Sequence, residues 1–155
     1  MREHFSAPWG MKLKIATAVL GLILVIAAFA ADGWGSLVAV GIGLIAATVA
    51  IRGYSIVDGV LLIHRLGWST KYDLAGLKNI RFEPGATMGS IRAMGIGGLF
   101  GFVGHYHNAM LGSYKAYATD ESRTVVMEFA RETIVVTPGD PLAFVEAAEA
   151  VRAGG

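Results

Sequence analysis

Cysteine is absent from this chain of 155 residues, and only four residues are proline. The absence of thiols excludes disulfide bonds, cysteine nucleophiles and thiolate metal ligands, and it fits a reducing compartment. Charged residues are also scarce, at 16% of the sequence, whereas 54% of the residues are hydrophobic. This balance is more apolar than that of an ordinary soluble domain, and the apolar excess lies in the first third of the chain.

The remaining two thirds carry no excess of either charge, with nine Lys or Arg and ten Asp or Glu in residues 53–155. Nucleic-acid binding requires a basic face, so we expect no nucleic-acid partner. No Gly-x-Ser-x-Gly nucleophile motif is present, and the glycines fit neither Gly-x-Gly-x-x-Gly nor a Gly-Lys-Ser/Thr phosphate loop. We therefore expect no catalytic residues, no enzyme activity and no cofactor.

Two apolar runs, residues 13–31 and 34–51, lie back to back near the start of the chain. Each is close to the roughly 20 helical residues that cross about 30 Å of hydrocarbon. Because only Asp32 and Gly33 separate the runs, two helices here must form a hairpin. The sequence therefore predicts a transmembrane helical hairpin in residues 1–52 and a separate domain in residues 53–155, a length that suits one core.

The charges around the hairpin predict its orientation. Lys and Arg near membrane helices are retained on the cytoplasmic side. Basic residues precede the first run and follow the second, whereas the linking turn has none, so both termini should face the cytoplasm. Tryptophan suits the headgroup region, and two tryptophans lie near the ends of the runs. The predicted membrane-anchoring residues are Trp9, Lys12, Lys14, Trp34 and Arg52.

A cleaved signal peptide is an alternative for the first run. Residues 28–30 (AFA) form a small-x-small site after a basic start, although the run exceeds the usual length of a signal-peptide core. In that case the second run would cross from outside to inside. The following domain is cytoplasmic under both interpretations.

After residue 53 the pattern changes to short β-type runs separated by turn residues. The Asp58-Gly59 pair predicts a two-residue hairpin turn between strands at 54–57 and 60–66. Further strands are expected at 69–73, 79–83, 113–119, 124–129 and 133–137, the last three as an antiparallel meander. Asp140 can cap a closing helix in which Pro141 occupies the first turn. Phe144, Ala148 and Val151 share one face of that helix.

About seven strands and a C-terminal helix predict a small, partly open antiparallel β-barrel with the helix plugging one end. An open sheet covered by the helix is the alternative. The class is therefore α+β, with an N-terminal membrane hairpin.

The segments at residues 95–101 (GIGGLFG), 111–112 (LG), 117–120 (YATD) and 134–141 (IVVTPGDP) occur in an order that resembles the bacterial pleckstrin-homology (PH) domain membrane proteins. The resemblance covers roughly residues 53–150. It implies a PH-like barrel with a binding or scaffolding role and no known ligand. With the orientation predicted for the hairpin, we expect this module to act at the cytoplasmic face of the bacterial inner membrane, through protein contacts. Phosphoinositide-binding PH domains carry basic residues around the first strand pair, whereas this chain has Asp58-Gly59 there. We therefore expect no phosphoinositide headgroup as partner.

The glycine-rich stretch at residues 85–112 is the most unusual part of the predicted domain. One hypothesis is a loop that contacts the membrane surface or a membrane-protein partner, because its centre is apolar but short for a span. The alternative is a strand with a tight corner, whose glycines permit close backbone approach. The predicted contact residues are Ile96, Leu99, Phe100 and Phe102, with Arg92 and Lys115 as electrostatic contributors.

Two further hypotheses concern metal binding and self-association. His105 and His107 would share one face of a strand and form a weak candidate metal site, although zinc sites need more ligands. Small residues on the second apolar run, including Gly41 and Gly43, favour close helix packing. That packing can be within the hairpin or between copies, so a structural homo-oligomer is the alternative function.

Overall fold

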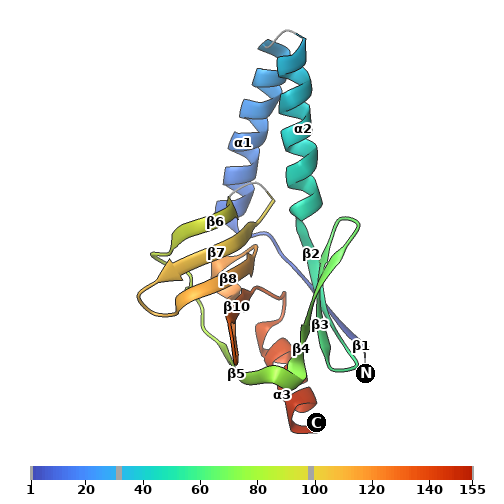
Figure 1. The fold of residues 1–155 in the computed structure, drawn as a ribbon, viewed down its shortest axis with the longest axis vertical. Helices are drawn as coiled ribbons and strands as arrows, with labels where there is room; N and C mark the ends of the chain where they lie inside the picture. The colour runs from blue at the N-terminus through green and yellow to red at the C-terminus, as the bar shows by residue number, and fades with distance from the viewer. Residues whose placement is uncertain (1, 31–32, 98–99, 155) are drawn as a thin grey trace.

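A computed structural model describes residues 2–30, 33–97 and 100–154 of the chain. These residues form three α-helices, ten β-strands and two short 3₁₀ helices. The helices are α1 (Met11–Ala30), α2 (Trp34–Val49), α3 (Pro141–Gly154), η1 (Leu74–Gly76) and η2 (Glu121–Arg123). The strands are β1 (Arg2–Ser6), β2 (Ile51–Val57), β3 (Val60–Arg65), β4 (Ser69–Asp73), β5 (Leu77–Phe82), β6 (Ile91–Gly97), β7 (Phe102–Asn108), β8 (Gly112–Ala118), β9 (Val125–Phe129) and β10 (Thr133–Val136). Figure 1 shows α1 and α2 projecting together from one end of a β-rich domain, with α3 at the other end.

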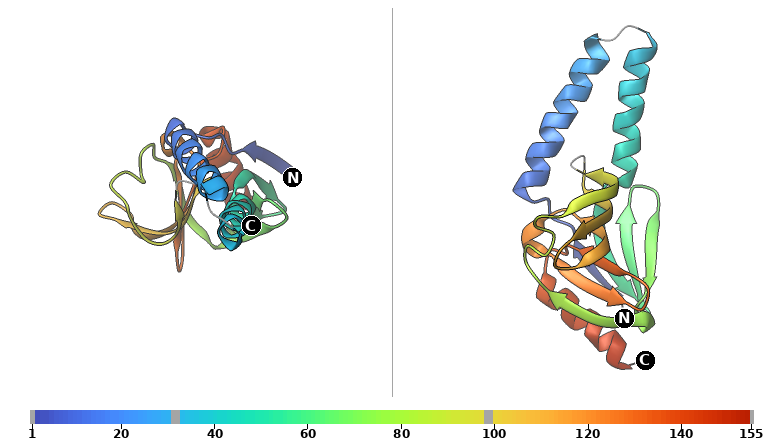
Figure 2. Two further views of the ribbon diagram at one scale, coloured as in Figure 1. Left: turned by 90° about the horizontal axis from the view of Figure 1, so that it is seen from above. Right: turned by 60° about the vertical axis from the view of Figure 1, so that its left-hand side comes forward.

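The two apolar runs form helices that pack side by side (Figure 2). Among the described residues, one helix, α1, is long and apolar enough by length and composition to cross a membrane, whereas α2 has 16 residues. A rise of 1.5 Å per residue gives lengths of about 30 Å and about 24 Å. The prediction that the second helix reaches residue 51 was wrong, because Ile51 starts β2 and is buried in the domain core.

The first sheet has the strand order β1-β2-β3-β4, with all neighbours antiparallel. The sequence analysis missed β1, which lies before the helices in the sequence. It pairs with β2, so both helices lie between two paired strands. The Asp58-Gly59 turn was predicted correctly, since both residues have positive φ angles of 48° and 81°. That pair of angles is what a type I′ turn requires.

The second sheet has the order β5-β9-β10-β8-β7-β6. The predicted antiparallel meander of the last three strands was wrong, because β10 lies between β9 and β8 and runs parallel to β8. The link between β8 and β9, which contains η2, lets β9 skip one position in the sheet. Sequence periodicity reports which residues are strands, but it does not report which strands are neighbours.

The prediction of a partly open barrel was not confirmed, because the two sheets share no strand and neither closes on itself. They pack as a sandwich of two open sheets. The common core combines Tyr54 and Leu61 of the first sheet with Met127 and Ile134 of the second, and Phe144 of α3 packs among them. The strand count of about seven was too low for the described residues, since β1, β6 and β7 were not predicted as strands.

The closing helix agrees with its sequence signals. The backbone N–H of Ala143 donates to Asp140 Oδ1 at 3.1 Å, so Asp140 caps α3 as predicted. Phe144 and Ala148 are fully buried, and Val151 packs against the same core.

The glycine-rich stretch forms a turn followed by the paired strands β6 and β7, so residues 91–97 and 102–108 are strand rather than loop. Gly95 and Gly104 face each other across the two strands. A Cβ at Gly104 would lie 2.2 Å from the Met94 carbonyl oxygen, and one at Gly95 would lie 2.3 Å from that of Val103. The glycines therefore permit the close backbone approach that the strand interpretation required.

Candidate functional site

The end of the domain next to the two helices gathers most of the predicted anchoring residues. We call it the hairpin-proximal surface and define it by the following residues of the described structure: Trp9, Lys12, Lys14, Arg52, Arg65, Leu66, Trp68 and Phe100. Two connections of the domain reach it, the end of the β6–β7 hairpin beside α1 and the β3–β4 turn at the level of the end of α2 (Figure 1).

The β6–β7 connection is fastened to α1 at Phe100. The backbone N–H of Phe100 donates to Thr17 Oγ1 at 3.2 Å, and its ring lies edge-on to the Trp9 indole with centroids 6.0 Å apart. Thr17 lies about 9 Å along the helix axis from Met11, at 1.5 Å per residue. The glycine-rich hairpin therefore reaches beyond the start of α1 and lies beside its apolar part.

The β3–β4 turn is fastened to α2 at Trp68, a residue that the sequence analysis did not select. Trp68 Nε1 donates to the carbonyl oxygen of Thr48 at 3.3 Å, one residue before the end of α2. The side chain of Trp68 is nevertheless 51% exposed, and Leu66 beside it is 43% exposed. A signal for this residue was present in the sequence. Trp68 is the third tryptophan of the chain, and it lies in a glycine-containing turn, where a large side chain is expected to be exposed.

All three tryptophans of the chain therefore lie at the ends of the helical hairpin. Trp9 precedes α1 and Trp68 contacts the end of α2, so both are at the domain end. Trp34 is the first residue of α2, at the far end, and is 84% exposed. The indole rings therefore mark both ends of the apolar helices, a position that indoles favour in proteins at a bilayer interface.

Four basic side chains lie on the hairpin-proximal surface. Lys12 Nζ pairs with Glu121 Oε2 at 2.5 Å, which links the first turn of α1 to η2. Lys14 and Arg52 are exposed. Arg65 is half-buried, with its guanidinium 4.2 Å from the centre of the Trp68 ring.

A groove of about 620 Å³ separates the first turn of α1 from the domain. Met11, Met88 and Phe102 give it an apolar lining, and the Lys12–Glu121 pair lies among its lining residues.

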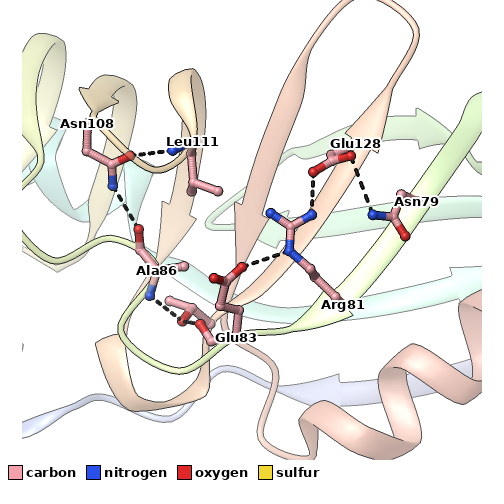
Figure 3. Close-up of polar contacts among 8 residues, drawn as sticks. Asn79, Arg81, Glu83, Ala86, Asn108, Leu111 and Glu128 are labelled. Carbon is pink, nitrogen blue, oxygen red and sulfur yellow. Dashed lines mark hydrogen bonds and ion pairs between the residues drawn. The ribbon is translucent and has the colours of Figure 1, made fainter.

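The loop that precedes β6 is held by a polar network (Figure 3). Asn108 Nδ2 donates to the Ala86 carbonyl oxygen at 2.8 Å, and Asn108 Oδ1 accepts from the Leu111 N–H at 2.7 Å. Beside it, Arg81 pairs with Glu83 at 2.7 Å and with Glu128. Hydrogen bonding to Arg81 lowers the pKa of Glu128. These contacts fix the position from which β6 and β7 extend toward α1.

The other predicted contact residues are dispersed. Arg92 is exposed on the edge strand β6, and Ile96 lies in the same strand. Phe102 is half-buried against the second apolar cluster of the domain, and Leu99 lies outside the described residues. Lys115 pairs with Glu132 at 2.6 Å, and hydrogen bonding to Glu132 raises the pKa of Lys115.

The two histidines of the weak metal hypothesis are exposed on β7. His107 Nδ1 lies 3.2 Å from Ser113 Oγ, within hydrogen-bonding distance. Within the described part of the chain, no group of three or more His, Cys, Asp or Glu side chains is placed to hold a metal ion.

The sequence of this domain matches a known protein family. The family model described as "Bacterial PH domain" matches residues 52–151. The chain belongs to the bacterial PH domain family. The resemblance inferred from the glycine-rich segment and the helix entry is therefore confirmed. The matched residues cover the strands from β2 to β10 and most of α3, whereas β1 lies outside the match. Comparison with curated proteins and with solved structures gave no match.

The first hairpin turn of the PH domain lies far from the hairpin-proximal surface. The Asp58-Gly59 turn is beside α3, where a Cβ at Gly59 would lie 3.9 Å from Val151 Cγ1. The β2–β3 turn and the β3–β4 turn are thus at opposite ends of the same strands (Figure 1). The surface next to the helices is built from other parts of the PH domain.

Proposed function

We propose that the helical hairpin crosses the bacterial inner membrane twice and holds the PH domain at its cytoplasmic face as a binding or scaffolding module. In this proposal residues 1–52 are the anchor, except that β1 joins the cytoplasmic domain of residues 53–155. The single observation that carries the proposal is the exposure of apolar side chains around both helices. The exposed large apolar residues of the hairpin are Met11, Ile15, Val19, Leu20, Leu22, Ile23, Val25, Ile26, Phe29, Trp34, Leu37, Val38, Val40, Ile42, Leu44 and Ile45.

A helix that is apolar on every side is stable when it is buried in protein or in lipid. Only Leu13 is buried in α1, and α2 buries Ala39 and Ala46. A Cβ at Gly43 would lie 3.9 Å from Leu24 Cδ1, which supports small-residue packing within the hairpin. Lipid would cover the remaining surface without a second protein chain.

The charges and tryptophans support the orientation. Lys12, Lys14 and Arg52 lie at the domain end, whereas the other end of the hairpin has no Lys or Arg in the sequence. Positive residues are retained in the cytoplasm, which favours a cytoplasmic domain and cytoplasmic termini. Trp9 and Trp68 would occupy the inner interface, and Trp34 the outer one.

The signal-peptide alternative is disfavoured by β1. Cleavage after residue 30 would remove the strand that pairs with β2 and the Phe5 side chain that packs on the core. The domain left behind would lack part of its first sheet.

The binding partner in this proposal is another membrane protein, contacted through the glycine-rich hairpin. The edge strand β6 has one unpaired side, and its Ile91 and Met94 side chains are 74% and 72% exposed. Exposed edge strands accept an added strand from a partner. Tethering confines the domain to the membrane surface, so weak contacts suffice. The proposed contact residues are Arg92, Ile96, Leu99, Phe100, Phe102 and Lys115.

Photo-crosslinking in cells tests this partner. A photoreactive amino acid replaces Met94 in one strain and Glu146, which is exposed on α3, in a control strain. The proposal predicts one recurrent membrane-protein adduct at position 94 that is absent at position 146, and its loss in the Phe100→Asp variant. Adducts with a second copy of the chain alone would support the homo-oligomer alternative, and equal adducts at both positions would contradict the β6 site.

A further inference from the structure

Arg65, at the end of β3, has no acidic partner in the part of the chain that the structure describes. None of the ion pairs among the described residues includes Arg65. Its guanidinium is half-buried, and its Nε is shielded from solvent without a hydrogen-bond partner. Desolvation lowers the pKa of Arg65, opposed by the phenols of Tyr117 and Tyr72. A half-buried cation in this state is stabilised by any anion that can reach it.

Aromatic side chains hold the guanidinium in a defined orientation. It lies 4.2 Å from the centroid of the Trp68 ring and 5.3 Å from that of Tyr117. The backbone N–H of Arg65 also donates to the Trp68 carbonyl oxygen at 2.9 Å, which closes the turn. One side of the guanidinium is engaged by a hydrogen bond with the Tyr117 side chain. Stacking on the indole leaves the other in-plane N–H groups available to a planar or tetrahedral oxyanion.

The position of the β3–β4 turn indicates which anion can reach Arg65. The contact between Trp68 Nε1 and the Thr48 carbonyl oxygen places the turn at the end of α2. If α2 crosses the membrane, its end lies in the headgroup layer, where phosphate groups are concentrated. Leu66 and Trp68 are exposed beside Arg65 and supply the apolar contact that an interfacial position favours.

We infer that Arg65, Leu66 and Trp68 form a binding site for the phosphate group of an anionic phospholipid in the cytoplasmic leaflet. This inference rests on the proposed membrane anchoring and names the ligand of the hairpin-proximal surface. The guanidinium binds the phosphate oxygens, while Leu66 and the indole contact the upper acyl chain. With the β6–β7 end beside α1, the turn gives the PH domain a second attachment, so its orientation on the bilayer is fixed.

The test uses the full-length chain in dodecyl maltoside micelles, with Trp9→Phe and Trp34→Phe so that Trp68 is the sole indole. The titrants are dihexanoyl phosphatidylglycerol, dihexanoylglycerol with the same chains, and inorganic phosphate. We expect a saturable change in Trp68 emission with the phospholipid, none with dihexanoylglycerol, and at least ten-fold weaker binding of inorganic phosphate. Arg65→Gln should weaken phospholipid binding by about ten-fold, since a hydrogen bond to a charged group is of this size. Arg131→Gln, which changes an exposed arginine between β9 and β10, should leave it unchanged.

Three results would overturn the site. The first is an unaltered phospholipid response in Arg65→Gln. The second is an equal response to dihexanoylglycerol, which would show an acyl-chain contact only. The third is an equal response to inorganic phosphate, which would show a site for soluble anions. Should Arg65→Gln melt early, Arg65→Lys replaces it, because lysine keeps the charge but loses the two-pronged geometry, and intermediate weakening is expected. Sedimentation of these variants with membranes separates the failure of the membrane anchor from the failure of the lipid site. Loss of sedimentation refutes the anchor. With sedimentation retained, the titration alone decides whether the lipid site exists.

Discussion

The ring of Phe5, which precedes the helical hairpin, packs edge-on against the ring of Phe144 in α3, with centroids 5.1 Å apart. Residues on both sides of the hairpin therefore belong to one core. The hairpin is an insertion between two adjacent strands, β1 and β2, rather than a leader that precedes a finished domain.

This packing predicts that the N-terminus is retained and stabilising. The intact mass of the protein recovered from membranes should include residues 2–30. Phe5→Ala should lower the free energy of unfolding by about 1–3 kcal/mol, because a half-buried ring is lost from the core. The measurement is thermal unfolding in detergent. Recovery of a mature chain that begins after residue 30 would contradict this prediction.

Gly104 is predicted to be irreplaceable in the β6–β7 hairpin. Its φ is 146°, and a Cβ there would lie 2.2 Å from the Met94 carbonyl oxygen. Gly104→Ala should therefore cost at least about 2 kcal/mol or separate the two strands. Hydrogen exchange of β6 and β7 provides the readout. Gly76→Ala is the matched control, since its Cβ would make an ordinary 3.8 Å contact with Phe129, and equal protection in both variants would refute the claim.

Tyr54 links the two sheets through its hydroxyl group. The Tyr54 hydroxyl donates to the Tyr117 carbonyl oxygen at 2.6 Å and accepts from the Thr137 N–H at 3.2 Å. Burial raises the pKa of Tyr54 to about 12. Tyr54→Phe removes both of these buried hydrogen bonds, so we expect a loss of about 1–3 kcal/mol in unfolding free energy. Chemical denaturation measures it, and an unchanged midpoint would show that the hydroxyl is dispensable.

The first sheet should lose stability in mild acid because of His64. Its ring bonds to Ser55 at 2.8 Å and to Ser69 at 3.1 Å, and Ser55 also bonds to His4 at 2.9 Å. Desolvation, followed by repulsion from His4, lowers the pKa of His64 below its ordinary 6.5. His64 in the unfolded chain then binds a proton more tightly than in the folded chain. The contribution of the neutral His64 to folding stability is therefore complete above pH 6.5 and declines as the pH falls below that value. His64→Gln should reduce the change in melting temperature between pH 7 and pH 5, whereas His107→Gln should leave that change as it is in the unsubstituted protein.

Local features of this protein were predictable from the sequence, whereas long-range pairings were not. The Asp58-Gly59 turn and the Asp140 cap are decided by neighbouring residues, so both were predicted correctly. The parallel β8–β10 pair depends on contacts between distant segments that no local pattern encodes. β1 was missed because five residues before an apolar run resemble a flexible leader.

The candidate site shows the same division. The positions of Trp9 and Trp34 at the ends of the helical hairpin were predictable because both residues flank the apolar runs in the sequence, and their anchoring role stays a prediction. Trp68 and Arg65 come next to the end of α2 only after the first sheet has folded, since the β3–β4 turn returns to that end. Phe100 was selected for its apolar surroundings, and its contacts with Trp9 and Thr17 required the structure.

Cysteine accessibility tests the central claim of a cytoplasmic PH domain on a membrane-spanning hairpin most directly, because the natural chain has no cysteine. Gly35→Cys places one thiol at the far end of the hairpin, and Ser122→Cys places one on the exposed η2 turn. In bacterial spheroplasts treated with a membrane-impermeant maleimide, we predict labelling of the Gly35→Cys variant alone, with Ser122→Cys labelled only after permeabilisation. Labelling at position 122 in intact spheroplasts, or recovery of the protein in the soluble fraction, would contradict the account.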